Sequence, residues 1–170
     1  MNPRKSLRFI DLFAGLGGFR VALSSYGENC VFSSEWDKHA ALTYQHNFNE
    51  LPFGDITKIA ESKIPEHDVL CAGFPCQAFS ISGKQKGFED TRGTLFFDIA
   101  RIAKFHRPKV LFLENVKNLA RHDDGKTLKT ILNTLDALDY TVFYQVINAS
   151  QYRSEEHTSE LQSPCNLVCR

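Results

Sequence analysis

The sequence lacks an excess of charge of either sign and lacks a long hydrophobic run. Its 170 residues contain 20 Lys and Arg against 20 Asp and Glu, so the formal net charge is zero. DNA-binding domains often carry a basic excess, so composition alone does not indicate a nucleic-acid partner. No apolar stretch approaches the ~20 residues that span a bilayer. Because the apolar run 9–13 is also too short for a signal peptide, we expect a cytoplasmic protein without a membrane partner.

Metal-ligand spacings are absent as well. The chain has five cysteines, which form no CxxC pair and have no histidine at a ligand spacing: Cys30, Cys71, Cys76, Cys165 and Cys169. The sequence therefore predicts no metal site. A single cysteine is by default a small buried side chain. Only the surroundings of Cys76 favour another role.

The chain changes character at residue 153. Residues 153–163 show neither helical nor strand periodicity, and they follow a strand-like run. Their sequence, RSEEHTSELQS, resembles a translated sequencing-library adapter. We interpret 153–170 as a non-native tail, with a natural disordered tail as the alternative, and 1–152 as the part that carries function.

Residues 1–152 alternate between strand and helix patterns. Short apolar runs predict strands at 8–13, 30–35, 67–72, 109–114 and 140–147. Apolar spacing of the i, i+3, i+4 kind predicts helices at 18–26, 38–47, 93–105 and 128–138. This alternation predicts an α/β fold with a doubly wound, mostly parallel sheet. Ligands of such sheets bind at the carboxyl ends of the strands.

A glycine-rich turn, Asp11–Gly18 with the sequence DLFAGLGG, joins the first strand to the first helix. Glycines there allow a ligand to approach the backbone closely. The spacing misses the dinucleotide fingerprint, because the third glycine position is Arg20. This disfavours a nicotinamide dehydrogenase and favours another nucleoside-bearing ligand. A plain tight turn is the alternative.

Two acidic residues follow the next strands. Glu35 ends the second strand, where a carboxylate can accept hydrogen bonds from ribose hydroxyls. Trp36, the only tryptophan, offers a face on which adenine can stack. Asp55 follows Gly54 and is placed to bond the adenine amine. The alternatives are a core position for Trp36 and a helix cap beside Thr57 for Asp55.

The segment Gly73–Ser80, with the sequence GFPCQAFS, opens a stretch without clear periodicity that runs to Arg92. Long loops in compact domains are usually functional. Cys76 at the mouth of the sheet is placed like a nucleophile, and neighbouring basic residues would lower the pKa of its thiol. After the fourth strand, Glu114 is placed where burial raises a carboxyl pKa and lets it donate a proton. Its alternative is a capping acid.

Together these motifs resemble the DNA cytosine-5 methyltransferase family, in particular its bacterial restriction-modification branch. The segments 9–19, 73–80 and 114–116 are similar to its first, fourth and sixth conserved blocks, and 34–37 and 54–56 to the second and third. The resemblance runs from about Leu7 to Tyr152. It implies a Rossmann-like fold that uses S-adenosyl-L-methionine, acting as a monomer in the bacterial cytoplasm on double-stranded DNA.

The resemblance also implies roles for individual residues. Cys76 is the nucleophile that adds to C6 of a flipped cytosine, and Glu114 holds or protonates N3. The cofactor pocket consists of Phe13, Leu16, Gly18, Glu35, Trp36, Asp55, Ile56, Pro75 and Leu95. The residues expected to contact DNA are Ser80, Ser82, Lys84 and Arg92.

The sequence departs from the family after Tyr152. Members continue there with Gly and a Gln-x-Arg-x-Arg block whose arginines help to hold the flipped base, and here the tail stands instead. We therefore expect this chain to be an impaired fragment that lacks the target recognition domain. Two alternatives remain: a fragment that binds the cofactor without catalysis, and a tRNA cytosine-5 methyltransferase.

Overall fold

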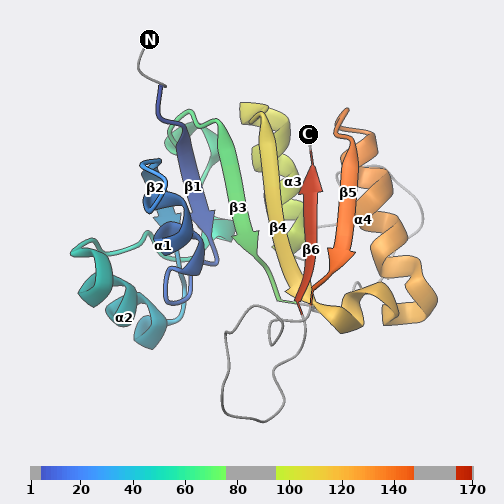
Figure 1. Cartoon of the computed structure of the whole chain (residues 1–170), viewed down its shortest axis with the longest axis horizontal. Helices are drawn as coiled ribbons and strands as arrows, with labels where there is room; N and C mark the ends of the chain where they lie inside the picture. Colours follow the sequence, from blue (N-terminus) through green and yellow to red (C-terminus); the bar gives the residue numbers. More distant parts are fainter. Residues whose placement is uncertain (1–4, 76–94, 148–163, 170) are drawn as a thin grey trace.

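The computed structural model describes residues 5–75, 95–147 and 164–169. A six-stranded sheet runs through the middle of the molecule, in the order β2-β1-β3-β4-β6-β5 (Figure 1). The strands are β1 (Arg8–Leu12), β2 (Asn29–Ser34), β3 (Val69–Gly73), β4 (Val110–Val116), β5 (Val142–Val146) and β6 (Pro164–Cys169). β6 runs antiparallel to β4 and β5, and the pairings β1–β2, β1–β3 and β3–β4 are parallel. The predicted mostly parallel α/β sheet is confirmed.

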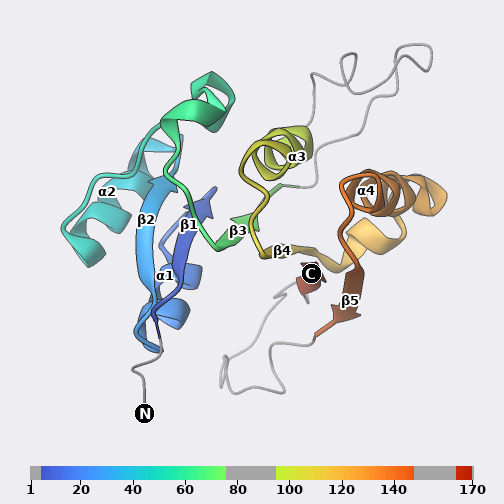
Figure 2. The same cartoon turned by 90° about the horizontal axis from the view of Figure 1, so that it is seen from above.

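Helices cover both faces of this sheet. They are α1 (Gly18–Ser24), α2 (Lys38–Phe48), α3 (Leu95–His106) and α4 (Lys126–Asp136), with short 3-10 turns η1 (Ile56–Lys58), η2 (Glu61–Lys63), η3 (Lys117–Ala120) and η4 (His122–Gly125). Figure 2 shows α3 and α4 on one face and α1 on the other. None of the helices in the described ranges is long and apolar enough to cross a membrane.

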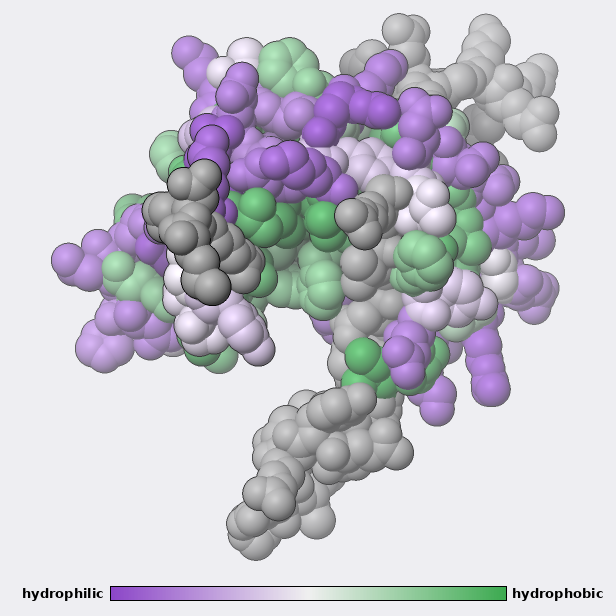
Figure 3. Space-filling view, turned by 45° about the horizontal axis from the view of Figure 1, so that its top comes forward, coloured by the Kyte–Doolittle hydropathy of each residue, from purple (hydrophilic) through white to green (hydrophobic). Residues whose placement is uncertain are grey.

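The main core lies between the sheet and the pair α3 and α4. Alternate residues of β1, such as Ile10 and Leu12, are fully buried against this pair, which contributes Ile99 and Ile131. Burying a side chain of this size stabilises the fold by roughly 1.5–3 kcal/mol. The opposite face carries a smaller cluster around Phe9, and Figure 3 shows hydrophobic surface in the middle of the molecule, bordered by hydrophilic residues.

Local signals in the sequence set two of the helix ends as predicted. The Asp37 carboxylate caps α2 by accepting hydrogen bonds from the backbone N–H groups of His39 and Ala40. Gly27 has a φ of 81°. Its N–H donates to the Ser24 carbonyl, and that of Glu28 to the Leu23 carbonyl. Paired bonds of this kind close a helix at a left-handed glycine, so the predicted closing role of Gly27 is confirmed, although α1 ends at Ser24 rather than at Tyr26.

The strand β6 was not predicted, because the sequence analysis assigned no structure beyond residue 147. It inserts between β4 and β5, and each of those strands pairs with it in antiparallel register. In the described part of the chain, β5 joins the sheet through β6 alone. The six residues show no periodicity that would predict a strand. We attribute β6 instead to the open edges of β4 and β5, whose unpaired backbone N–H and C=O groups pair with it.

Candidate cofactor site

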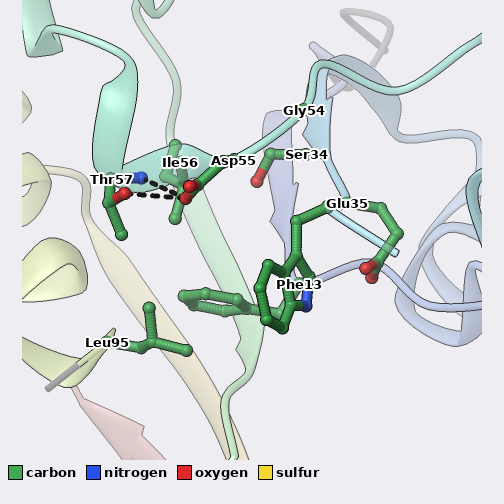
Figure 4. A pocket seen from close by; sticks show the side chains of 9 residues that line it. Phe13, Ser34, Glu35, Gly54, Asp55, Ile56, Thr57 and Leu95 are labelled. Carbon is green, nitrogen blue, oxygen red and sulfur yellow. Dashed lines mark hydrogen bonds between the residues drawn. The ribbon is translucent and has the colours of Figure 1, made fainter. Parts of the chain in front are cut away.

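A pocket opens where β1 and β2 end and η1 begins, at the carboxyl edge that the sheet topology predicts (Figure 4). The pocket is open to solvent, and its cavity volume is about 160 Å3. Its lining residues are Phe13, Ser34, Glu35, Trp36, Gly54, Asp55, Ile56, Thr57 and Leu95.

Six of the nine residues predicted to bind the cofactor line this pocket: Phe13, Glu35, Trp36, Asp55, Ile56 and Leu95. Three others, Leu16, Gly18 and Pro75, are exposed and do not line it. Three further residues line the pocket without having been predicted, although each stands directly beside a predicted one: Ser34, Gly54 and Thr57. Adjacency to Glu35 and Asp55 was the signal that could have found them.

The Glu35 carboxylate ties the glycine-rich turn to the junction of β2 and α2. One oxygen accepts the backbone N–H of Gly15 at 2.8 Å and the other accepts that of Asp37 at 2.8 Å. Only 9% of the residue is exposed. Each carboxylate oxygen keeps a further lone pair, so Glu35 can also accept hydrogen bonds from hydroxyl groups of a ligand. Figure 4 shows Glu35 and Leu95 on opposite sides of the pocket.

Close packing requires glycine at position 17 of the glycine-rich turn. Gly17 has a φ of 90°, and a Cβ built on it would lie 2.1 Å from Cε2 of Phe48. Phe48 itself packs on Tyr44, and the guanidinium of Arg20 lies over both rings. Gly17 therefore allows α1 to approach α2, which is a structural role beside the predicted approach of a ligand.

Trp36 is not a core residue. Its exposed fraction is 70%, and it stands at the pocket. This exposure contradicts the alternative that places it in the core. A large exposed aromatic side chain at a cavity is suited to stack on a planar ligand.

Asp55 both caps a helical turn and lines the pocket, the two roles that the sequence leaves open. Its Oδ1 accepts the backbone N–H of Thr57 at 3.0 Å and the Thr57 hydroxyl at 2.8 Å, so it caps η1. The hydrogen bond from the Thr57 hydroxyl contributes most to lowering the pKa of Asp55. Its Oδ2 lies 3.4 Å from Nζ of the exposed Lys58 side chain. The capping carboxylate still lines the pocket, and Oδ2, which accepts fewer hydrogen bonds than Oδ1, keeps a lone pair for a ligand donor.

Glu114 stands in β4, opposite Gly73 in the register of β3. The strand runs on to Val116, and it is Val116 rather than Glu114 that stands at the N-cap of η3. Burial raises the pKa of the Glu114 carboxyl, as predicted. A Cβ at position 73 would lie 3.3 Å from Oε2 of Glu114, so the glycine leaves space beside the carboxyl.

Asn115, the residue after Glu114, forms a hydrogen bond to the backbone at Phe74, shortly before the predicted nucleophile Cys76. Asn115 is 2% exposed, and its Nδ2 donates to the Phe74 carbonyl at 2.5 Å. Cys76 follows two residues later in the sequence. Cys76 and the predicted DNA-contacting residues lie outside the described residues: Ser80, Ser82, Lys84 and Arg92.

Asp11 is an unusual group that the sequence analysis did not single out as titratable. It lies at the base of the glycine-rich turn and is 1% exposed, and in the described part of the chain neither carboxylate oxygen accepts a hydrogen bond of ordinary geometry. Burial raises the pKa of Asp11 to about 7, and the nearby Arg20 offsets this only in part. Strongly shifted groups of this kind cluster at functional sites.

Comparison with known proteins gives consistent matches. A family model described as C-5 cytosine-specific DNA methylase matches residues 7–155. The chain is 61% identical over 159 residues to the type II methyltransferase M.HhaI of Haemophilus parahaemolyticus, covering 94% of this chain and 49% of that protein. It is 64% identical over 137 residues to M.HpaII of Haemophilus parainfluenzae, covering 79% and 38%. The chain thus spans at most about half the length of these curated relatives.

Solved structures show the same fold. The Dnmt2 methyltransferase of S. pombe has a TM-score of 0.73 at 19% identity, covering 96% of this chain and 50% of that one. A putative DNA modification methyltransferase from an E. coli prophage has a TM-score of 0.73 at 24% identity, covering 96% and 46%. At these identities the likeness shows a shared fold and nothing more.

Proposed function

Because the chain belongs to the C-5 cytosine-specific DNA methylase family, we propose that it forms the cofactor-binding and catalytic part of an enzyme that methylates C5 of cytosine in duplex DNA. The proposed methyl donor is S-adenosyl-L-methionine. The observation that carries the proposal is the pocket at the ends of β1 and β2, where Glu35, Trp36 and Asp55 line one cavity.

The lining residues suit an adenosyl group. Trp36 is free to stack on the adenine, Glu35 has lone pairs left for the two ribose hydroxyls, and Asp55 offers Oδ2 to the adenine amine. When bound, the cofactor supplies a methyl group on a positively charged sulfur. The protein must then make C5 of cytosine nucleophilic enough to take it.

The proposed chemistry proceeds through Cys76. Its thiolate adds to C6 of the flipped cytosine, which makes C5 enamine-like, and C5 then takes the methyl group as the C–S bond of the donor breaks. A base removes the proton from C5, the Cys76–C6 bond breaks, and 5-methylcytosine is released. Flipping is part of the proposal because the target carbon is inaccessible inside a duplex.

Glu114 is proposed to act on N3 of the same ring. Burial raises the pKa of its carboxyl, which favours the protonated form that can donate a hydrogen bond or a proton to N3 as charge develops. The proposed DNA contacts of Ser80, Ser82, Lys84 and Arg92 rest on the sequence alone.

We expect S-adenosylmethionine to quench Trp36 fluorescence in a saturable way, because Trp36 is the only tryptophan and stands at the pocket. Glu35→Gln should weaken binding roughly 10- to 100-fold, since it removes the charge from hydrogen bonds worth about 1.5–3 kcal/mol each. The matched control is Glu66→Gln, because the Glu66 side chain is 86% exposed. A chain that shows no quenching, or equal affinity in wild type and Glu35→Gln, would contradict the assignment of the pocket.

We expect the 170-residue chain to transfer little or no methyl to duplex DNA, because the family's arginine block does not follow Tyr152 in this sequence. The chemistry can be tested in a chimera that joins residues 1–152 to the second half of M.HhaI. Transfer of labelled methyl groups to cytosine C5 should appear in the chimera and be abolished by Cys76→Ser. Activity that survives Cys76→Ser would refute the covalent mechanism, and strong activity of the 170-residue chain would refute its expected impairment.

A further inference from the structure

Arg101 joins three segments around the pocket without lining it. It lies on α3, where its Nε donates to Oδ1 of Asp98 at 2.8 Å. Its Nη1 pairs with Oε1 of Glu61 in η2 at 2.9 Å. Its Nη2 donates to the backbone carbonyl of Ile56 in η1 at 2.7 Å. One side chain therefore connects α3 to both short turns that follow β2.

These contacts are partly shielded from water. The exposed fractions of the Arg101, Asp98 and Glu61 side chains are 28%, 18% and 30%. Hydrogen bonds to ionised groups are stronger than neutral ones, and a planar guanidinium holds its acceptors in fixed directions. The contact to the Ile56 carbonyl is thus a directional link rather than a loose surface ion pair.

The link joins two walls of the pocket. Leu95, the first residue of α3, lines one wall, and Asp55 and Ile56 line the next (Figure 4). Arg101 lies on the same helix as Leu95 and grips the carbonyl of Ile56. Arg101 therefore connects the helix that carries Leu95 to the backbone next to Asp55.

We propose that Arg101 is a positioning residue that holds Asp55 where it accepts the adenine amine, and so contributes to the selectivity of the pocket for adenosyl over other purine nucleosides. This inference rests on the proposed function of the pocket. Lysine cannot replace arginine here, because a single ammonium on a flexible stem does not reach three acceptors in one plane.

The test compares two ligands on the 170-residue chain. The probes are S-adenosylhomocysteine and its inosyl analogue, in which an oxygen replaces the adenine amine, each titrated against Trp36 fluorescence. Wild type should prefer the adenosyl ligand, since a site that accepts a hydrogen bond rejects an analogue without the donor. Arg101→Lys should reduce this preference by about fivefold or more, because Asp55 is no longer held in place.

The matched control is Arg107→Lys. Arg107 also donates to a backbone carbonyl, that of Leu138 at 2.5 Å, and pairs with a carboxylate, that of Asp139 at 3.2 Å, but neither partner lines the pocket. It should leave the preference unchanged. Urea unfolding of both variants shows whether they fold alike. If Arg101→Lys fails to fold, Glu61→Gln removes one anchor only and should reduce the preference to a smaller extent.

The outcomes separate the two proposals. If Arg101→Lys weakens both ligands by the same factor, or changes neither, Arg101 has no positioning role and the inference is overturned while the pocket stands. If wild type binds both ligands equally, Asp55 does not accept a hydrogen bond from the adenine amine, and the inference is overturned. If wild type binds neither, the assignment of the cofactor pocket fails first, and the inference falls with it.

Discussion

Asp11→Asn should raise the free energy of unfolding at pH 8 by roughly 3–4 kcal/mol and change it by less than about 1 kcal/mol at pH 4. The pKa of Asp11 is raised from 3.8 to about 7 by burial. Each unit of such a shift corresponds to about 1.36 kcal/mol. Asparagine has nearly the same shape and carries no charge to desolvate.

The direction follows from the protons bound in each state. Between pH 3.8 and about 7, the folded chain binds a proton at Asp11 that the unfolded chain has released. Stability therefore falls as pH rises through this window and stays low above it. Asp11→Asn removes this contribution, so the difference between the two curves grows from pH 4 to pH 7 and then becomes constant.

The measurement is urea unfolding of both proteins at intervals from pH 4 to pH 8. The difference between the two proteins is compared because His67 changes stability with pH in the opposite direction. Burial lowers the pKa of His67 to about 4. Its contribution to stability is therefore lost as pH falls from 6.5 towards 4. The control is Asp124→Asn, at an exposed position. A difference between wild type and Asp11→Asn that does not vary with pH would show that burial does not raise the pKa of Asp11.

Leu167→Pro should release β5 from the sheet and destabilise the fold by roughly 2–4 kcal/mol, because proline in a central strand removes a ladder hydrogen bond and cannot be accommodated there. Leu167 is paired with Leu113 of β4 on one side and Tyr144 of β5 on the other. Within the described residues β5 has no other strand partner.

Hydrogen exchange tests this prediction directly. The amides of residues 142–146 should exchange faster in Leu167→Pro. The exchange rates of the β1 and β3 amides, farther from β5 in the sheet, should change far less. Leu167→Ala keeps the backbone N–H and is the matched control. Unchanged protection of β5 in the proline variant would show that residues 164–169 do not hold β5 in the sheet.

Much of the fold follows from local sequence. The apolar runs and helical spacings predicted five strands and four helices to within a few residues, because each pattern matches the period of its element. The cap residues Asp37 and Gly27 marked helix ends by their own chemistry. The motifs around Glu35, Asp55 and Glu114 pointed to the carboxyl edge, because parallel strands end together there.

Other features were decided only by residues distant in sequence. The strand β6 depends on two open edges rather than on its own residues. The burial of the Asp11 carboxylate, and the hydrogen bond from Arg101 to the Ile56 carbonyl 45 positions away, arise from packing between elements. The sequence by itself determined the family, the strand-helix order and most of the pocket, since these are encoded in short motifs. The tertiary structure decided the pKa of Asp11, the link through Arg101 and the pairing of β5, since each depends on which groups meet in space.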